Sequence, residues 1–285
     1  MFCLKTGVAI AANFMRNIVS KYQIMPKEKV GIIGCGWLGY RIAKHLTNYY
    51  EIHTTVTSEN KIEFLSREGF YPEIVNFEIN TPESKQRPWQ KLSQLDHIII
   101  TVPLFSKRTE QAVLDTRIRN LSDFILKFEG TLLLMSSIGV YKDLTGDVTE
   151  DRLPAENCTG EKEIKQLFTQ VNILRLGGLM GDDRLLHKYK VADLDAKVNH
   201  IHFHDICRVV QLLIANAARS RLYNLVAPLH PSKRAVINWQ TEPNVAPSPK
   251  PDEKLILSQK IIKEMGYKFV YPDPRYFHIP NQLAE

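Results

Sequence analysis

Residues 30–39 read Val-Gly-Ile-Ile-Gly-Cys-Gly-Trp-Leu-Gly, and this stretch decides the fold. Its first four residues predict a strand, its last six match Gly-x-Gly-x-x-Gly, and an amphipathic helix is expected to follow. In such a turn Gly34 makes the tight bend, Gly36 lets the backbone approach a diphosphate, and Gly39 allows close packing of helix on strand. The free N–H groups and positive dipole end of the helix then favour phosphates. We therefore predict that this segment holds the diphosphate of a dinucleotide.

Further apolar runs follow at intervals that are filled by helical patterns. The expected strands cover residues 52–57, 97–102, 132–135 and 173–176, and the expected helices cover residues 39–46, 61–68, 108–127 and 161–171. Strands that alternate with helices are typical of a parallel sheet covered on both faces, with right-handed crossovers. The sequence thus predicts an α/β fold, a Rossmann-like doubly wound parallel sheet with helices on both faces.

The pattern loosens after Gly181, where a small C-terminal substrate lobe is expected. Residues 199–203 and 223–226 are strand-like, residues 205–218 and 260–265 are helical, and residues 228–251 are rich in proline and polar side chains. We divide the chain into a flexible N-terminal extension (1–28), a dinucleotide-binding domain (29–181), and the remainder of the sheet with the lobe (182–285). The acid-free first 27 residues leave a cleaved targeting peptide as the less favoured alternative.

The composition and charge of the chain argue against several classes of protein. The 285 residues carry 37 basic and 31 acidic side chains, with no basic block of the nucleic-acid-binding type and no apolar run of membrane-spanning length. The four cysteines form no Cys-x-x-Cys pair, so neither a disulfide framework nor a zinc ribbon is indicated. We expect a reduced, cytoplasmic protein that acts on a small molecule and has neither a nucleic-acid nor a membrane partner.

Specificity for the adenosine ribose is set at the end of the second strand, where NAD-binding proteins place an acid on the 2′-hydroxyl. This chain has no acid there until Glu59. The hydroxyls of Thr55 and Thr57, with Lys61 nearby, instead suit a 2′-phosphate, so NADP is predicted over NAD. The alternative is that the threonines are there only as β-branched strand formers.

The end of the fourth expected strand is predicted to contact the same cofactor through its backbone. The complete set of expected cofactor-binding residues is Gly34, Gly36, Trp37, Leu38, Gly39, Thr55, Thr57, Lys61, Thr101, Val102 and Pro103.

From about residue 29 to residue 277 the motif order resembles the extended short-chain dehydrogenase/reductase superfamily, the NAD-dependent epimerase/dehydratase group, and within it an atypical bacterial YeeZ-like branch. The resemblance rests on Gly-Cys-Gly-Trp-Leu-Gly (34–39), Ile-Ile-Ile-Thr-Val-Pro (98–103), Ser-Ser-Ile-Gly-Val-Tyr (136–141), Leu-Arg-Leu-Gly-Gly-Leu-Met-Gly (174–181), Tyr-Asn-Leu-Val-Ala-Pro (223–228) and Tyr-Pro-Asp-Pro (271–274). It implies a homodimer paired through the fourth and fifth helices, and a substrate bordered by the stretch from Arg175 to Arg184.

The resemblance also implies a catalytic serine and a Tyr-x-x-x-Lys pair, in which the lysine lowers the tyrosine pKa. Ser137 occupies the serine position, but Thr159 stands in place of the tyrosine and Glu163 in place of the lysine. Lys162 is one residue off, about 100° around the helix. Ser137 is therefore expected to bind substrate, and Tyr141 is the candidate replacement acid.

Two hypotheses for function remain open. The protein is an NADP-dependent oxidoreductase or epimerase of atypical mechanism, or it is a dinucleotide-binding sensor or regulatory protein without redox chemistry. A zinc site formed by His200, His202 and His204 is less favoured than a strand leading into a helix, with Asp205 as the capping acid.

Overall fold

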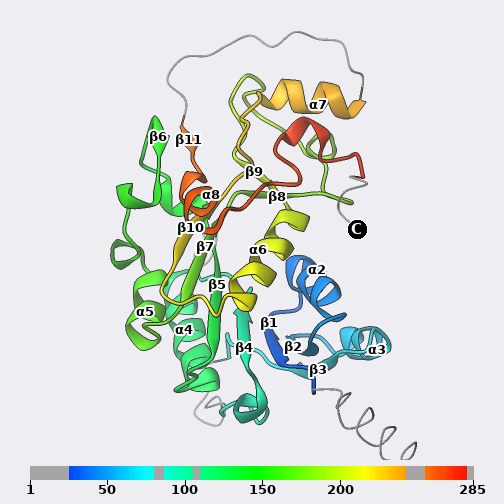
Figure 1. Cartoon of the computed structure of the whole chain (residues 1–285), viewed down its shortest axis with the longest axis vertical. Coiled ribbons are helices and arrows are strands. Elements are labelled where there is room, and N and C mark those ends of the chain that lie inside the picture. Colours follow the sequence, from blue (N-terminus) through cyan, green and yellow to red (C-terminus); the bar gives the residue numbers. More distant parts are fainter. Residues whose placement is uncertain (1–25, 80–86, 105–109, 242–253, 281–285) are drawn as a thin grey trace, which may run out of the picture.

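The computed structural model describes residues 26–79, 87–104, 110–241 and 254–280 (Figure 1). The expected N-terminal extension lies almost wholly outside the described residues. Within them, no helix is long and apolar enough to cross a membrane.

A seven-stranded parallel sheet organises the molecule, as the alternating pattern predicted. Its order is β10-β7-β5-β4-β1-β2-β3, and all six pairings are parallel. The strands are β1 (Lys29–Ile33), β2 (Glu51–Val56), β3 (Tyr71–Ile74), β4 (His97–Ile100), β5 (Thr131–Ser137), β7 (Asn172–Leu176) and β10 (Leu222–Leu225). Chain direction across the sheet reverses between β1 and β4, so a ligand crevice is expected beyond the carboxyl ends of these two strands.

Helices cover both faces of the sheet because its central strands are apolar on both sides. In β4, Ile99 packs into one core while Ile98 and Ile100 pack into the other. The first core is covered by α2 (Trp37–Leu46), α3 (Asn60–Arg67), α6 (Phe203–Ala215) and α8 (Gln259–Met265), and the second by α4 (Gln111–Ile125) and α5 (Glu161–Leu167). Figure 1 shows α2 and α6 on the side opposite α4 and α5.

Several elements differ from the sequence-based expectation, and three of them bear on the main sheet and the lobe. The edge strand β3 was not predicted, because it is short, half-exposed and carries Pro72, which only an edge strand tolerates. Helix α5 ends at Leu167, before the expected residue 171, because Phe168 leaves helical geometry at φ −132°. Helix α7 (Lys233–Thr241) forms inside the segment rich in proline and polar side chains, where no helix was predicted.

Short elements form a lobe beyond the carboxyl edge of the sheet. They are the parallel pairs β8 (Gly178–Met180) with β9 (His200–His202), and β6 (Asp147–Val148) with β11 (Leu255–Ile256), together with α7. Figure 1 places α7 at the far end of the lobe, above the sheet.

Asp205 holds the C-terminal segment 267–271 against α6 and does not cap α6 as expected. Its buried carboxylate accepts hydrogen bonds from the Tyr267 hydroxyl at 2.6 Å and from the backbone N–H groups of Val270 at 2.8 Å and Tyr271 at 3.0 Å. The cap is His202, whose Nδ1 accepts from the His204 N–H at 3.2 Å. The sequence placed the helix start two residues too late, which accounts for the difference.

Candidate functional site

Each glycine in the turn between β1 and α2 has a different structural role. Gly34 has φ +95°, and a Cβ there would lie 2.8 Å from Val102 Cγ2. A Cβ on Gly39 would lie 2.5 Å from the Gly34 carbonyl oxygen, so this glycine permits the close approach of helix and turn. A Cβ on Gly36 would meet nothing within 4 Å. The open space at Gly36, in front of the α2 N-terminus, fits a diphosphate.

Two threonines hold this turn in place. The Thr55 hydroxyl accepts from the Gly34 N–H at 2.9 Å, and the Thr55 carbonyl accepts from the Cys35 N–H at 2.7 Å. The Thr101 hydroxyl donates to the carbonyl oxygens of Ile33 and Gly34. Thr55 is only 1% exposed, so its hydroxyl supports the turn itself.

A cavity of about 340 Å³ opens beside the turn. The expected residues Thr57 and Lys61 lie at its exposed rim, and Val102 and Pro103 form part of its wall. Its other lining residues are Gly34, Cys35, Gly36, Thr55, Val56, Val75, Asn76, Phe77, Glu78, Thr101 and Arg117. The sequence did not reveal the edge strand β3, so the lining residues that follow this strand were not predicted. Arg117 of α4 was not predicted as a lining residue either.

A second cavity of about 210 Å³ adjoins the first, and Thr101 and Pro103 line both. It extends to Ser137 at the end of β5 and to Thr159 before α5. Its remaining walls are Leu38, Leu104, Leu134, Met135, Ser136, Glu161, Leu176, Gly177 and Leu179. We refer to these two adjoining cavities together as the cleft, which lies at the point where the strand order reverses.

The Trp37 side chain faces away from this cleft, although Trp37 stands at the start of α2. Its Nε1 donates to the Asp183 carboxylate at 2.9 Å, and the Arg41 and Arg184 guanidinium groups lie 3.8 and 4.1 Å from the ring centroid. The tryptophan therefore joins α2 to the turn after β8, and Arg184 packs there as well.

Ser137 lies in the second cavity, where its Oγ accepts from the Gly139 N–H at 3.0 Å. The exposed Thr159 side chain shares that cavity, so the position of the family tyrosine does face the cleft. Glu163 is half-buried and lines neither cavity, and Lys162 is exposed away from them.

Tyr141 lines neither cavity and is fully buried. Its hydroxyl donates to Asn224 Oδ1 at 2.8 Å and accepts from Arg175 Nη1 at 2.6 Å. Burial raises the pKa of this phenol to about 12, despite the nearby guanidinium. The geometry argues against Tyr141 as the replacement acid, and its catalytic role stays a prediction.

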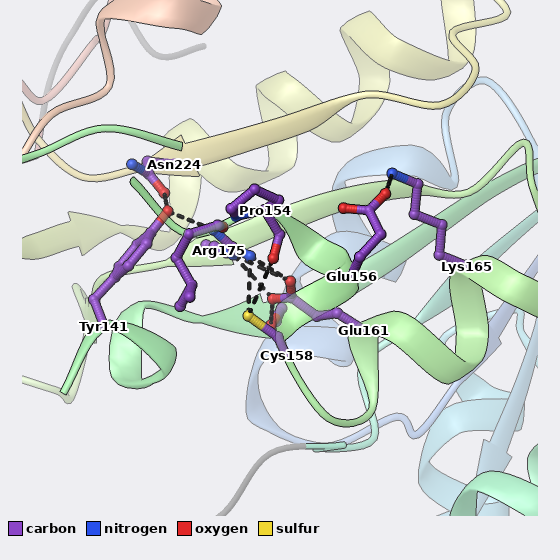
Figure 2. A network of polar contacts seen from close by, with 10 residues as sticks. Tyr141, Pro154, Glu156, Cys158, Glu161, Lys165, Arg175 and Asn224 are labelled. Atoms are coloured by element: carbon purple, nitrogen blue, oxygen red, sulfur yellow. Dashed lines mark hydrogen bonds and ion pairs between the residues drawn. The ribbon is translucent and has the colours of Figure 1, made fainter. Parts of the chain in front are cut away.

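Arg175 is the centre of a buried network that the sequence did not reveal (Figure 2). It is 0% exposed and pairs with Glu161, Nη2 to Oε2, at 2.6 Å. Arg175 itself does not line the second cavity, although Leu176, Gly177 and Leu179 of the same stretch do. One signal was available: an arginine inside the apolar strand Asn-Ile-Leu-Arg-Leu needs a buried acid.

The three histidines of β9 and α6 face different neighbours. The His202 ring stacks on Tyr271 with centroids 3.7 Å apart, and the His204 ring lies 6.0 Å from that of His45. Burial lowers the pKa of His202 to about 3 and those of His200 and His204 to about 4. Among the described residues no group of three potential ligands is arranged to hold a metal.

The fold and cleft define the class: a Rossmann-like α/β protein of the epimerase/dehydratase structural type. The chain is a homologue of Protein YeeZ of Escherichia coli (strain K12), with 28% identity over 272 residues that cover 87% of this chain and 97% of YeeZ. No family model matches the chain.

Solved structures share the fold at low sequence identity. The Bordetella bronchiseptica enzyme WbmG, in complex with NAD and UDP, superposes with a TM-score of 0.68 at 16% identity, covering 92% of this chain and 95% of WbmG. The dTDP-glucose 4,6-dehydratase of Bacillus anthracis, in complex with NAD, has a TM-score of 0.62 at 14% identity over 87% and 94%. The UDP-N-acetylglucosamine 4-epimerase of Bacillus cereus has a TM-score of 0.60 at 13% identity over 88% and 96%.

Proposed function

We propose that the protein binds NADP(H) in the cleft formed by the two cavities and acts as an oxidoreductase or epimerase-like enzyme on a small molecule. The observation that carries this proposal is the pair of adjoining cavities that share Thr101 and Pro103, one lined by Gly36 and the other by Ser137. Two structural neighbours that were solved with NAD support a dinucleotide as the ligand.

Each part of the cofactor has a matching part of the cleft. The diphosphate takes the space at Gly36 and the α2 N-terminus, and the adenosine takes the cavity beside it. Lys61 and Thr57 at the rim suit a 2′-phosphate, which favours NADP over NAD. The nicotinamide, which accepts or donates hydride when bound, takes the second cavity.

The chain's own groups in the second cavity bind and orient a substrate. The Ser137 hydroxyl lies at the strand end where it can bind a substrate oxygen, and the Thr159 hydroxyl offers a second hydrogen bond. Neither hydroxyl group has a pKa suited to general acid catalysis near neutral pH. In the proposed reaction, solvent water that reaches the exposed Thr159 therefore donates or accepts the substrate proton.

A sensor without redox chemistry is the second candidate. Thr159 in the tyrosine position and the burial of Tyr141 favour it, because together they leave the cleft without a phenol. The homodimer implied by the resemblance also remains a proposal.

Calorimetric titration with NADP(H) and NAD(H) tests the cofactor assignment. We expect NADP(H) to bind more tightly, and Lys61→Ala to weaken NADP(H) about fivefold while it leaves NAD(H) nearly unchanged, because one exposed charge on a phosphate contributes about 1 kcal/mol. Lys44→Ala, on α2 outside both cofactor cavities, is the matched control. Absence of binding by all four dinucleotides refutes both candidate functions.

Turnover of a panel of carbonyl compounds and nucleotide sugars separates enzyme from sensor. We expect Ser137→Ala to lose turnover and to keep cofactor affinity, and Tyr141→Phe to keep turnover, because its hydroxyl lies outside the cleft. Intact NADP(H) binding with no turnover across the panel identifies the sensor.

A further inference from the structure

The polar lining of the second cavity carries negative but no positive charge. Four residues with hydroxyl groups line it, together with the acidic residue Glu161. Among the described residues no lysine, arginine or histidine side chain lines it. The position where the resembling family has a lysine is Glu163 in this chain.

The Glu161 carboxylate is built into the cavity wall and is held there by three donor groups. It is 2% exposed, and its Oε1 accepts from the Ser136 hydroxyl at 2.5 Å and from Arg175 Nε at 3.0 Å. Its Oε2 accepts from Arg175 Nη2 at 2.6 Å (Figure 2). These hydrogen bonds fix the orientation of the Glu161 side chain.

Arg175 lies on the far side of Glu161 from the cavity. It does not line the cavity, and its remaining N–H groups point inward, to the Tyr141 hydroxyl at 2.6 Å, the Leu153 carbonyl at 2.7 Å and Cys158 Sγ at 3.3 Å. Figure 2 shows the guanidinium between Tyr141 and Glu161. The ion pair is thus a fixed dipole with its negative end toward the cavity.

The two oxidation states of a nicotinamide differ in charge: the oxidised pyridinium ring is a cation and the reduced ring is neutral. We infer that this cavity selects the oxidised cofactor, NADP⁺, over NADPH, with Glu161 as the specificity-determining residue. The inference rests on the proposed function, since it places the nicotinamide in this cavity. Partial cancellation by Arg175 reduces the attraction, so about a tenfold difference in affinity is expected.

The ratio of the dissociation constants of NADPH and NADP⁺ is the quantity to measure. We expect it to be about 10 for the wild-type protein and to fall toward 1 in Glu161→Gln, where the negative charge is gone. Glu156→Gln is the matched control, because Glu156 is an exposed acid that pairs with Lys165 outside the cavity. Its ratio should stay at the wild-type value.

Glu161→Gln leaves the buried Arg175 without its counter-charge and can unfold the chain, so a second variant is needed. Thr159→Lys adds a cation at the exposed rim of the cavity and breaks no buried pair. It should lower the ratio severalfold, with an unchanged circular dichroism spectrum. A wild-type ratio of 1 or below, or a ratio that Thr159→Lys does not change, overturns the inference, whereas no binding of either form refutes the proposed function instead.

Discussion

Gly34 and Gly36 lie in one turn, yet they are glycines for opposite reasons. At Gly34 the backbone has a positive φ, and the space for a side chain is filled by Val102. At Gly36 the backbone has φ −84° and ψ −153°, which an L-residue adopts without strain, and the space for a side chain is open. The first glycine is required by the fold and the second by the proposed ligand.

This contrast makes a pair of substitutions informative. Gly36→Val should abolish dinucleotide binding and change the free energy of unfolding by less than about 1 kcal/mol, because its side chain enters the space of the diphosphate. Gly34→Ala should cost about 1–3 kcal/mol of stability, from strain at positive φ and the contact with Val102. Urea unfolding and calorimetric titration measure the two effects. A Gly36→Val protein that binds NADP(H) normally would show that the diphosphate lies elsewhere.

Residues at the start of helix α6 both cap its N-terminus and hold the C-terminal segment of the chain against it. His202 caps its N-terminus and stacks on Tyr271, while Asp205 in its first turn accepts three hydrogen bonds from residues 267–271. The C-terminal segment is therefore held against α6 by a buried imidazole and a buried carboxylate.

Burial of His202 predicts a loss of stability in acid. Its pKa is lowered to about 3, mainly by burial, from an ordinary value of 6.5. Below pH 6.5 the unfolded chain takes up a proton at His202 that the folded chain does not. The contribution of the neutral His202 to the free energy of unfolding is therefore complete above pH 6.5 and is lost as the pH falls toward 3. At pH 5 the loss should be about 2 kcal/mol.

Urea unfolding at pH 7 and pH 5 checks this prediction with two variants. His202→Asn removes the titrating group and keeps a side chain that caps helices well, so it should reduce the pH-dependent loss by about 2 kcal/mol. The same replacement at half-buried His187, in the lobe, is the control. An identical pH dependence in wild type and His202→Asn would contradict the assignment.

Strands that are buried on both faces could be predicted from the sequence. Features that depend on contacts between segments distant in the sequence could not. The runs that became β1, β4 and β5 are continuously apolar, and the glycine turn follows from local chemistry. The ion pair of Glu161 with Arg175 instead depends on the packing of α5 beside β7, which periodicity does not specify. The same reason hid β3, whose strand conformation depends on pairing with β2.

At the scale of the whole molecule, the cleft is a property of topology. The crossovers on either side of β1 and β4 go to opposite faces, so their loops separate and leave a crevice at the carboxyl edge. Thr101, directly after β4, hydrogen-bonds to the turn after β1 and lines both cavities. A ligand that spans the cleft therefore contacts both halves of the sheet and the edge of the lobe.

Such a ligand should stabilise the whole chain in proportion to the part of the cleft it fills. At a concentration of about 100 times its dissociation constant, NADP⁺ should add about 2.7 kcal/mol and raise Tm by several degrees. At the same concentration 2′,5′-ADP, which fills only the cavity beside Gly36, should bind more weakly and raise Tm less, and ADP without the 2′-phosphate should raise it less again. Differential scanning calorimetry measures these shifts, with Gly36→Val as the control in which they should vanish. Equal shifts from 2′,5′-ADP and NADP⁺ would mean that the nicotinamide half makes no contact with the second cavity, and would restrict the ligand to the adenosine half of the cleft.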